Sequence, residues 1–523
     1  MKNHVAALFA SLTIASSPWT QCETAQLTCP DAAANHKFGD GLDVYGDLCV
    51  TGGSGVDAGA QDAGGACVWT RIAGTWIHAQ TLQSPSPTPG GHMGVCVAIF
   101  GDIAVISEPQ FGAPGGKGVV HIYSVGPGGL TYLTTLAASN GSAGDKFGFH
   151  VATDGTWVVV GAFDHGSSGA VYAYRQELAG TWVEYPVVPQ GVSSGAEFGV
   201  SVGVSNGRIV VGARYDGGTG KAYFFDWTGS AWQQVLATTT SLTGPGYELG
   251  TAVAIDGDTA AVAAIQAIDP NNGASGAGGV VVFSRTPGGW AETAVLHSDD
   301  AEANDFLGHG LAVTGDRIVA GAHGDDDGGE ASGSAYVFRQ LSSGWTQVQK
   351  LRASNAAQGD SFGDLGSVAA HETTAVIGAP GVDAGVADSG TAYVFDLQEL
   401  EATCTFQNGT GLNPAEFGCV STPVVGKTWK ASFSGASLTA DMTGLAVGGS
   451  SPPGSTFSGE LLLSAPLVLF QLSNQLCCQE IPIPCNPALV GWQLTAQGFS
   501  LSQSGGVPTC TFLNAQNLRL GTY

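Results

Sequence analysis

The sequence predicts an all-β protein, with a seven-bladed β-propeller followed by a small β-sandwich domain. Two observations support this prediction. One is a repeated unit of four short apolar segments separated by Gly, Asp and Ser clusters, which is the pattern of a four-stranded antiparallel sheet. The other is composition, because 80 Gly and only 11% charged residues among 523 fit many tight turns and few exposed helices.

The repeated unit is clearest in residues 305–351. Its first segment opens at Leu307-Gly308 and its other three segments cover 317–322, 334–339 and 345–351. A Gly-Asp turn separates the first two segments, and an Asp- and Gly-rich loop separates the second from the third. Each copy is therefore predicted to form one small sheet of four sequential strands.

Seven apolar-Gly pairs open copies of this unit, with a mean spacing of 54 residues. They are Phe38-Gly39, Met93-Gly94, Phe147-Gly148, Phe198-Gly199, Leu249-Gly250, Leu307-Gly308 and Phe362-Gly363. One small sheet cannot bury both of its faces, whereas neighbouring sheets stacked face to face can. The period therefore predicts radial repetition, which is a propeller over residues 18–397.

The ring is expected to close through its N-terminal segment. Residues 27–38 align without a gap on residues 351–362, so the first apolar-Gly pair is also preceded by a fourth-strand pattern. We expect a strand within 24–30 to complete the blade that starts at Phe362. Such pairing would remove an exposed sheet edge.

The unit resembles the FG-GAP repeat, the blade of integrin-α-type propellers, which also occurs in many bacterial secreted proteins. The resemblance covers about residues 24–397. It rests on the seven pairs, on the third-segment phrase 333–338 echoed at 390–395, and on a Gly-Ala that ends the second segment at Gly161, Gly212, Gly321 and Gly378. The second blade departs most, with Ile-Ser-Glu-Pro at 106–109.

Charge and targeting patterns indicate an exported protein. Residues 1–17 have the pattern of a signal peptide, and the longest later apolar run, 461–470, is too short to span a membrane. We therefore expect no transmembrane segment after signal cleavage, and a secreted or cell-surface location. A formal charge of −26 argues against binding nucleic acid, which needs a basic surface.

Eleven cysteines fit an oxidising compartment, and none lies between 97 and 403. Aligned on the sixth blade, Cys49 and Cys67 fall on adjacent strands of the first blade, where a disulfide is possible. A Cys49–Cys67 bridge is the pairing we expect in the propeller, with two buried free thiols as the alternative.

After a linker at 398–403, residues 404–523 lose the repeat. About eight short strands separated by turn clusters predict a β-sandwich, with a closed barrel as the alternative. The region resembles the C-terminal β-sandwich module of secreted proteins of planctomycete-type bacteria, through the segment Ile481–Trp492. That resemblance implies secretion and surface attachment or sorting, and no activity.

Calcium is the metal that the FG-GAP resemblance implies, because some loops of that family bind Ca²⁺ through an Asp-x-Asp-x-Asp-Gly pattern. The candidate ligands here lie in the sixth, seventh, first and fifth blades and are Asp325, Asp326, Asp327, Asp383, Asp388, Asp57, Asp62 and Asp269. None of these loops has the alternate-residue spacing of that pattern. Solvated turns therefore remain the alternative.

Catalysis finds no support in the sequence, because no nucleophile elbow opens a helix and the histidines are scattered. His150 and His309 follow two of the apolar-Gly pairs, where a histidine is more commonly a packed structural residue than a catalytic one.

The predicted function is a non-enzymatic binding or adhesion protein that presents one propeller face to an extracellular protein or glycan. The alternative is an extracellular enzyme that processes polysaccharides or phosphoesters. The binding face should be the end with the most variable loops, from 163–168 to 265–278. The oligomeric state stays open.

Overall fold

The computed structural model describes residues 20–21, 23–177, 180–242 and 244–397, followed by eight strands between 403 and 519. Residues 23–397 form one compact unit, and the C-terminal strands belong to a second. The signal peptide expected at 1–17 and residues 398–402 of the expected linker lie outside the described residues.

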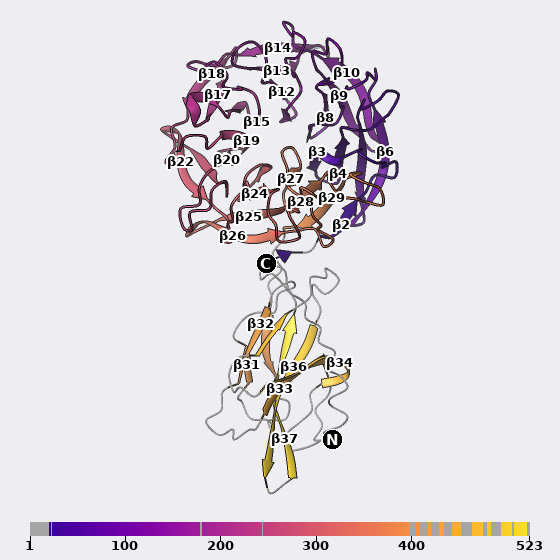
Figure 1. Ribbon diagram of the computed structural model, residues 1–523, viewed down its shortest axis with the longest axis vertical. Helices are drawn as coiled ribbons and strands as arrows, with labels where there is room; N and C mark the ends of the chain where they lie inside the picture. The colour runs from indigo at the N-terminus through magenta and orange to yellow at the C-terminus, as the bar shows by residue number, and fades with distance from the viewer. Residues whose placement is uncertain are drawn as a thin grey trace. The chain divides into compact units, whose positions relative to one another are not determined.

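The first unit is a ring of seven four-stranded antiparallel blades, which confirms the predicted propeller (Figure 1). Blades one to three are β3 (Phe38–Tyr45), β4 (Leu48–Gly53), β5 (Gly65–Ile72) and β6 (Thr75–Gln83); β7 (Val97–Phe100), β8 (Ile103–Glu108), β9 (Val119–Gly126) and β10 (Gly129–Leu136); and β11 (Val151–Thr153), β12 (Trp157–Ala162), β13 (Ala170–Gln176) and β14 (Trp182–Val187).

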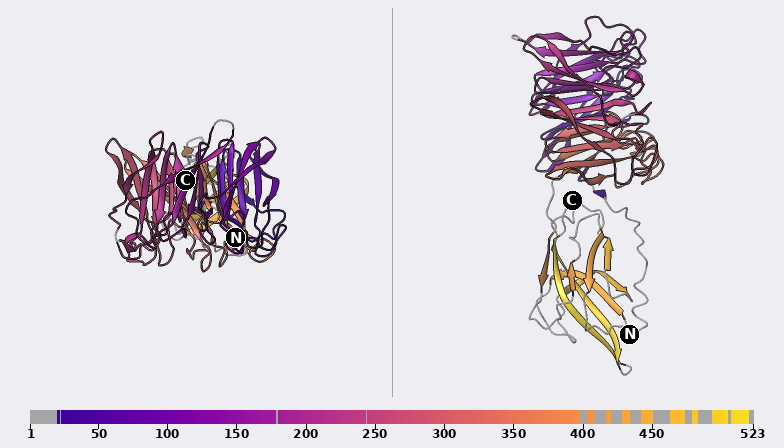
Figure 2. Two further views of the ribbon diagram at one scale, coloured as in Figure 1. Left: turned by 90° about the horizontal axis from the view of Figure 1, so that it is seen from above. Right: turned by 90° about the vertical axis from the view of Figure 1, so that its left-hand side faces the viewer.

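Blades four to six follow the same plan, and Figure 2 shows from the side how the strands run between the two faces of the ring. They are β15 (Val202–Ser205), β16 (Arg208–Ala213), β17 (Lys221–Trp227) and β18 (Trp232–Ala237); β19 (Leu249–Asp256), β20 (Thr259–Ala264), β21 (Val280–Thr286) and β22 (Gly289–Leu296); and β23 (Leu311–Thr314), β24 (Arg317–Ala322), β25 (Ser334–Leu341) and β26 (Gly344–Leu351).

Blade seven closes the ring. It contains β27 (Val368–His371), β28 (Thr374–Ala379) and β29 (Thr391–Asp396), and its outer strand is the N-terminal β2 (Ala25–Leu27). Ala25 pairs with Val394 and Leu27 with Ala392, so segments from the two ends of the propeller sequence share one sheet. The predicted closure is confirmed. A two-residue strand, β1 (Thr20–Gln21), precedes β2.

The repeated Phe-Gly and Gly-Ala phrases contact each other between neighbouring blades. A Cβ placed on Gly321, at the end of β24, would lie 2.0 Å from the carbonyl oxygen of Gly363 in the next blade. Gly363 has φ +86°, a left-handed conformation that favours glycine. Phe362, which precedes it, is fully buried and packs against Tyr393 at 5.7 Å between ring centroids. The motif is therefore a close-packing contact between blades, which explains its recurrence around the ring.

In the second unit the described strands form two antiparallel sheets, with five and three strands. The five-stranded sheet has the order β30 (Thr403–Gln407), β37 (Val507–Arg519), β36 (Gln493–Ser504), β33 (Met442–Ser450) and β34 (Leu463–Ser473). The other has the order β31 (Phe417–Cys419), β32 (Thr428–Phe433) and β35 (Gln479–Pro482). The all-β class is confirmed for this part as well.

Among the described residues, no helix is long and apolar enough to cross a membrane.

Candidate functional site

The first strands of all seven blades line a central channel that encloses about 190 Å³. Its wall is mostly aliphatic, as shown by one residue from each blade: Leu42, Val97, Val151, Val202, Val253, Leu311 and Val368. Asp43, His150 and Thr153 are the polar side chains that interrupt it.

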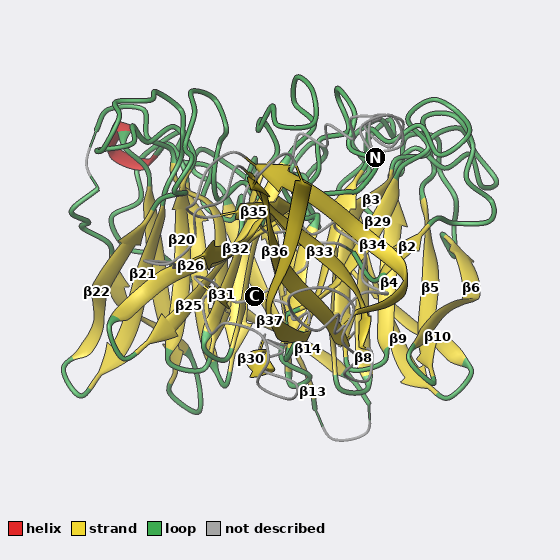
Figure 3. Ribbon diagram, turned by 90° about the horizontal axis from the view of Figure 1, so that it is seen from below, coloured by secondary structure: helices red, strands yellow, loops and turns green. Residues whose placement is uncertain are grey.

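One face of the ring carries the longer loops, which join second to third strands and lead from one blade into the next (Figure 3). The loops between second and third strands range from 163–169 in blade three to 265–279 in blade five, and the short 3-10 helix η1 (Asp216–Gly218) lies in that of blade four. We call this end the loop face. Its loops vary as the sequence predicted for a binding face.

In every blade the residue before the apolar-Gly pair has the same left-handed backbone, with φ between 54° and 58°. These seven residues are Lys37, His92, Lys146, Glu197, Glu248, Phe306 and Ser361. The backbone is thus constant while the side chains change from basic to acidic to aromatic. A rigid scaffold that varies its side chains at equivalent positions is the usual arrangement of a recognition surface.

Blades two and three contribute an aromatic patch, defined here as Phe111, Phe149 and Phe163 with Lys146. Ring centroids lie 6.0 Å apart for Phe111 and Phe149 and 4.6 Å apart for Phe149 and Phe163. The Lys146 ammonium lies 4.7 Å from the centroid of Phe163 and 2.9 Å from a carboxylate oxygen of Asp164. Phe111 is 42% exposed, so the patch presents aromatic surface to the solvent.

Blade four carries an ion pair and an exposed tyrosine on the same face. Arg214 Nε donates to Glu197 Oε2 at 2.6 Å, and its guanidinium lies 4.9 Å from the ring centroid of Tyr215. Burial raises the pKa of Glu248 in blade five above its usual value, although the nearby Arg214 opposes that effect. The loop face therefore carries charged and aromatic groups in blades four and five as well.

Blades six and seven bring together two histidines and a carboxylate, which we call the His-Asp cluster: His309, His323 and Asp364. His309 Nδ1 lies 2.6 Å from Asp364 Oδ1, and the centroids of the two imidazole rings are 4.4 Å apart. Phe306 stacks on His323 at 5.3 Å. Each side chain is partly buried, so the cluster stays open to the loop face.

The pKa values of His323 and Asp364 are both lowered. Burial lowers the pKa of His323, and the charge of His309 lowers it further. Burial alone would raise the pKa of Asp364, but the contact with His309 and the charge of both histidines hold it below its usual value. The carboxylate is therefore ionised, and His323 favours the neutral form.

The sequence had shown His309 as a packed residue and had not singled out His323 or Asp364. One pattern could have found them. His309 and Asp364 occupy the same position of consecutive repeats, directly after the Gly of the apolar-Gly pair, while His323 directly follows a Gly-Ala. Residues at these positions meet because the two phrases pack against each other. The other histidine of the sequence prediction, His150, lies apart from the cluster, where its Nδ1 accepts a hydrogen bond from Val202 N–H at 3.4 Å.

Three of the predicted calcium carboxylates close their own loops. Asp57 Oδ1 accepts a hydrogen bond from the backbone N–H of Asp62 at 2.8 Å, and Asp383 Oδ1 accepts one from Asp388 N–H at 2.9 Å. Asp326 makes the same five-residue contact, to Ala331 N–H at 2.7 Å. Each donor residue has a positive φ, between 47° and 52°. These aspartates therefore stabilise one recurring turn in blades one, six and seven.

Asp325 and Asp327 lie around an internal cation. The Lys350 ammonium, from β26, donates to Asp325 Oδ2 at 2.7 Å, to Asp327 Oδ2 at 2.8 Å and to Asp300 Oδ2 at 2.8 Å. Asp325 is buried and also accepts a hydrogen bond from Tyr336 at 2.9 Å. Burial alone would raise the pKa of Asp325, but the Lys350 charge and hydrogen bond hold it below its usual value. In this loop the ammonium group occupies the centre of the carboxylates.

Asp269 is buried in the loop of blade five. Its Oδ1 accepts backbone hydrogen bonds from Asn271 at 2.7 Å and from Asn272 at 3.0 Å. Its Oδ2 makes no hydrogen bond and lies 3.8 Å from His297 Nδ1. Within the described residues, none of the eight predicted calcium ligands belongs to a group of three potential His, Cys, Asp or Glu ligands. Calcium binding stays a prediction.

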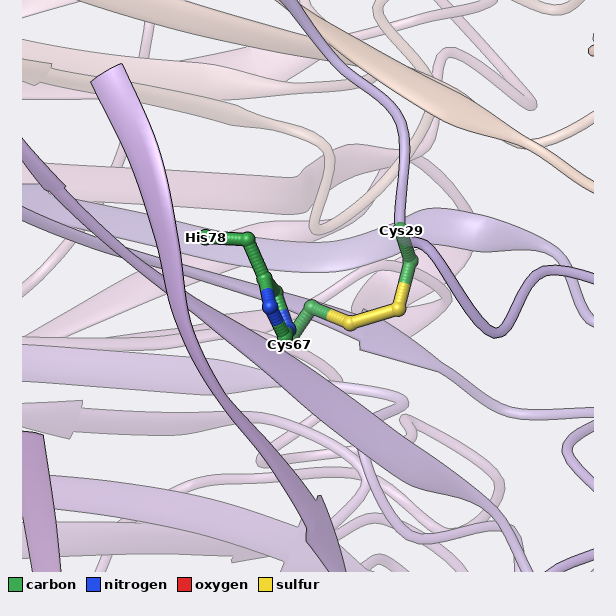
Figure 4. Close-up of side chains that lie close together, drawn as sticks. All are labelled: Cys29, Cys67 and His78. Atoms are coloured by element: carbon green, nitrogen blue, oxygen red, sulfur yellow. A yellow bond between two sulfur atoms is a disulfide. The ribbon is translucent and has the colours of Figure 1, made fainter.

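The predicted Cys49–Cys67 bridge is wrong. Cys67 forms a disulfide with Cys29, their Cα atoms 6.1 Å apart, while Cys49 is a buried free thiol (Figure 4). In the register of β4 and β5, Cys67 lies opposite Thr51, so Cys49 is only a diagonal neighbour of Cys67. Cys29 follows β2 of blade seven, and the disulfide therefore joins the closing strand to blade one. Cys96 is also a buried free thiol, and burial raises its pKa to about 12.

Comparison with known protein families identifies the repeat. Four stretches match the FG-GAP repeat model, namely 131–174, 185–225, 290–338 and 345–395. The propeller contains FG-GAP repeats. Each stretch runs from the fourth strand of one blade to the third strand of the next, and the four cover the blades whose second strand ends in Gly-Ala. The FG-GAP propeller thus matches the family model most clearly where its inter-blade contact has the full motif.

No curated protein matches the sequence. Among solved structures, the FG-GAP propeller is similar to a candidate 6-phosphogluconolactonase from Bacteroides uniformis ATCC 8492, with 12% identity and a TM-score of 0.40 over 62% of this chain and 88% of that one. It is also similar to a chain of a mitotic checkpoint complex, with 13% identity and a TM-score of 0.44 over 74% of this chain and 98% of that one.

Proposed function

We propose that this protein is an exported, non-enzymatic binding protein that presents the loop face of its FG-GAP propeller to an extracellular protein or glycan. The observation that carries the proposal is the ring of seven positions with one backbone conformation and different side chains, beside an exposed aromatic patch. Aromatic rings supply large contact area at low entropic cost and are enriched at binding surfaces. The signal-like N-terminus and the resemblance of residues 404–523 to a secretion module support export and attachment or sorting at the surface.

The aromatic patch allows a controlled test of this function. Phe111→Ser removes an exposed ring from the loop face, while Phe100→Ser removes an equally exposed ring, 43% against 42%, at the turn between β7 and β8, away from the loops that join second to third strands. Purified full chain would be screened on glycan arrays and against extracellular protein extracts. A ligand bound by the wild type and by Phe100→Ser, but at least tenfold more weakly by Phe111→Ser, supports the loop face. Equal loss in both variants, or loss only in Phe100→Ser, contradicts it.

An enzyme acting on extracellular polysaccharides or phosphoesters is the second candidate, and the His-Asp cluster is the observation that favours it. The binding function is preferred because the cluster joins only two neighbouring blades and the described channel wall is aliphatic. The test is a turnover assay with these two substrate classes. Turnover that His309→Gln abolishes without unfolding the protein would replace the binding function with the enzyme.

A further inference from the structure

The His-Asp cluster has the arrangement of metal ligands. One donor atom from each of His309, His323 and Asp364 can be chosen such that all three lie within 4.8 Å of one another. Ligands of a tetrahedral zinc ion at its usual bond lengths lie about 3.3 Å apart. The 2.6 Å between His309 Nδ1 and Asp364 Oδ1 is shorter, so the partly buried carboxylate has to rotate away from His309 to admit an ion between them.

One imidazole nitrogen of the cluster has no hydrogen-bond partner. His323 Nδ1 is buried and makes no hydrogen bond, whereas His309 Nδ1 is paired with Asp364 Oδ1. Both ring nitrogens of His121, by contrast, are engaged, with Glu108 at 2.7 Å and Thr135 at 2.9 Å. A buried nitrogen without a partner loses its interaction with water and gains nothing in return. Coordination of a cation would supply the missing interaction.

The backbone holds the three ligands in place. His309 and Asp364 each follow a glycine that is hydrogen-bonded to the second strand of its own blade, since Gly308 N–H donates to Gly321 O at 2.7 Å and Gly363 N–H to Gly378 O at 3.0 Å. His323 is supported from the side by the Phe306 ring. The ligands therefore lie on rigid strand ends and are positioned before an ion arrives.

We propose that His309, His323 and Asp364 bind a divalent ion of the zinc class across blades six and seven. Two imidazole nitrogens and one carboxylate oxygen suit zinc and related first-row metals, whereas calcium prefers ligand sets made of oxygen alone. Three protein ligands leave a fourth position for water. The site differs in residues and ligand type from the acidic loops, and it does not depend on the proposed binding function.

Titration of chelator-treated full chain with zinc chloride at neutral pH tests the site. We expect one ion per chain, and at least tenfold weaker binding in His323→Gln and in Asp364→Asn. His92→Gln is the matched control, because His92 lies on the same face but contacts the carbonyl oxygen of Ser54 at 3.0 Å, and it should bind as the wild type does. Cobalt should give the visible absorption of a tetrahedral N/O site in the wild type and in His92→Gln, and should not give it in His323→Gln or Asp364→Asn.

Several outcomes would overturn the proposal. One is the absence of zinc binding by the wild type up to millimolar concentration, and another is equal binding by the wild type and Asp364→Asn. The described residues contain one other such group, Cys29, Cys67 and His78, whose two cysteines could act as thiolate ligands only after reduction of their disulfide. Loss of zinc binding in His78→Gln, together with wild-type binding in His323→Gln, would place the ion there instead. Asp364→Asn keeps the size of a partly buried side chain, so the test stands even if a histidine variant fails to fold.

Discussion

Replacing Lys350 with methionine should destabilise the propeller strongly, because it removes the cation from a set of three carboxylates. The Lys350 side chain is 3% exposed, and its ammonium contacts Asp300, Asp325 and Asp327 at 2.7–2.8 Å. Methionine keeps the unbranched apolar stem and fills much of the same space. The change therefore removes a charge and leaves most of the packing.

The magnitude follows from how each partner is buried. Two unit charges 2.8 Å apart attract by about 6 kcal/mol at an effective dielectric constant of 20, before the cost of desolvation is subtracted. The Asp300 and Asp327 side chains are 44% and 40% exposed and are screened by water, whereas that of Asp325 is only 6% exposed. Removal of one member of a buried ion pair typically costs about 3–5 kcal/mol. We expect Lys350→Met to lose that amount near pH 7.

The loss should shrink in acid. In the wild type the pKa of Asp325 in the folded state lies below its usual value, so the contribution of Asp325 to stability is full above the usual pKa and is lost as pH falls below it. In Lys350→Met burial becomes the largest influence and raises the folded pKa of Asp325. The variant therefore loses stability as pH rises through that raised pKa. The difference between the two proteins is therefore largest at neutral pH and smaller near pH 4.

Urea unfolding of both proteins at pH 7.5 and pH 4.5 measures this difference. Lys146→Met is the control, because Lys146 and Asp164 form an ion pair with 36% and 41% exposure that should be worth less than about 1 kcal/mol. Millimolar calcium should restore part of the stability of Lys350→Met by occupying the vacated position. A loss below 1 kcal/mol at both pH values, or a larger loss in acid, would refute the account of this loop.

Three further predictions concern ring closure and the channel. Deletion of residues 18–31 should lower the free energy of unfolding by about 3 kcal/mol or more and promote association, because buried Leu27 and the Cys29 bridge are lost and a sheet edge is exposed. Calorimetry measures the loss of stability and light scattering the association. A monomer of unchanged stability would contradict the ring closure. Cys29→Ser should cost about 2–4 kcal/mol in urea unfolding and should make stability insensitive to reductant. Burial lowers the pKa of His150 from 6.5 to about 4, so the unfolded chain takes up its proton first and stability falls by up to about 3 kcal/mol as pH drops through this range. His150→Asn should remove that fall in stability relative to the wild type. Asp43, whose pKa burial raises to about 7, stabilises the folded state as pH drops, and it does so in both proteins. Identical stability profiles of the two proteins against pH would contradict the assignment to His150.

The blades and their closure could be predicted from sequence because their determinants are local. Apolar alternation defines each strand, and the turn residues between strands define the meander. The contact between Gly321 and Gly363 can also be recognised in the sequence, because both positions are glycine in every blade that has the full motif and a side chain at either would clash. A repeat shows such contacts as a recurring phrase even when the two halves of the phrase lie in different blades.

The partner of Cys67 could not be predicted in this way. Aligning blade one on blade six placed Cys49 and Cys67 on adjacent strands, which is correct, but it gave no information on which residues face the neighbouring blade. Cys29 approaches from blade seven, whose outer strand β2 comes from the N-terminal end of the propeller sequence. The repeat therefore predicts what all blades share, and the disulfide belongs to the one place where the ring is interrupted.

The acidic loops show the same limit in electrostatic terms. The sequence displays neighbouring aspartates, which suggested calcium, but the cation that contacts Asp325 comes from a residue 25 positions later in the next strand pair. Blade four repeats the arrangement with Lys221 at 3.2 Å from Asp216, which also accepts a hydrogen bond from Tyr223. Buried carboxylates in these two loops are thus neutralised by the protein's own lysines. The His-Asp cluster differs because the buried His323 Nδ1 makes no hydrogen bond, and for that reason the cluster, rather than these two loops, is where an external cation would gain most.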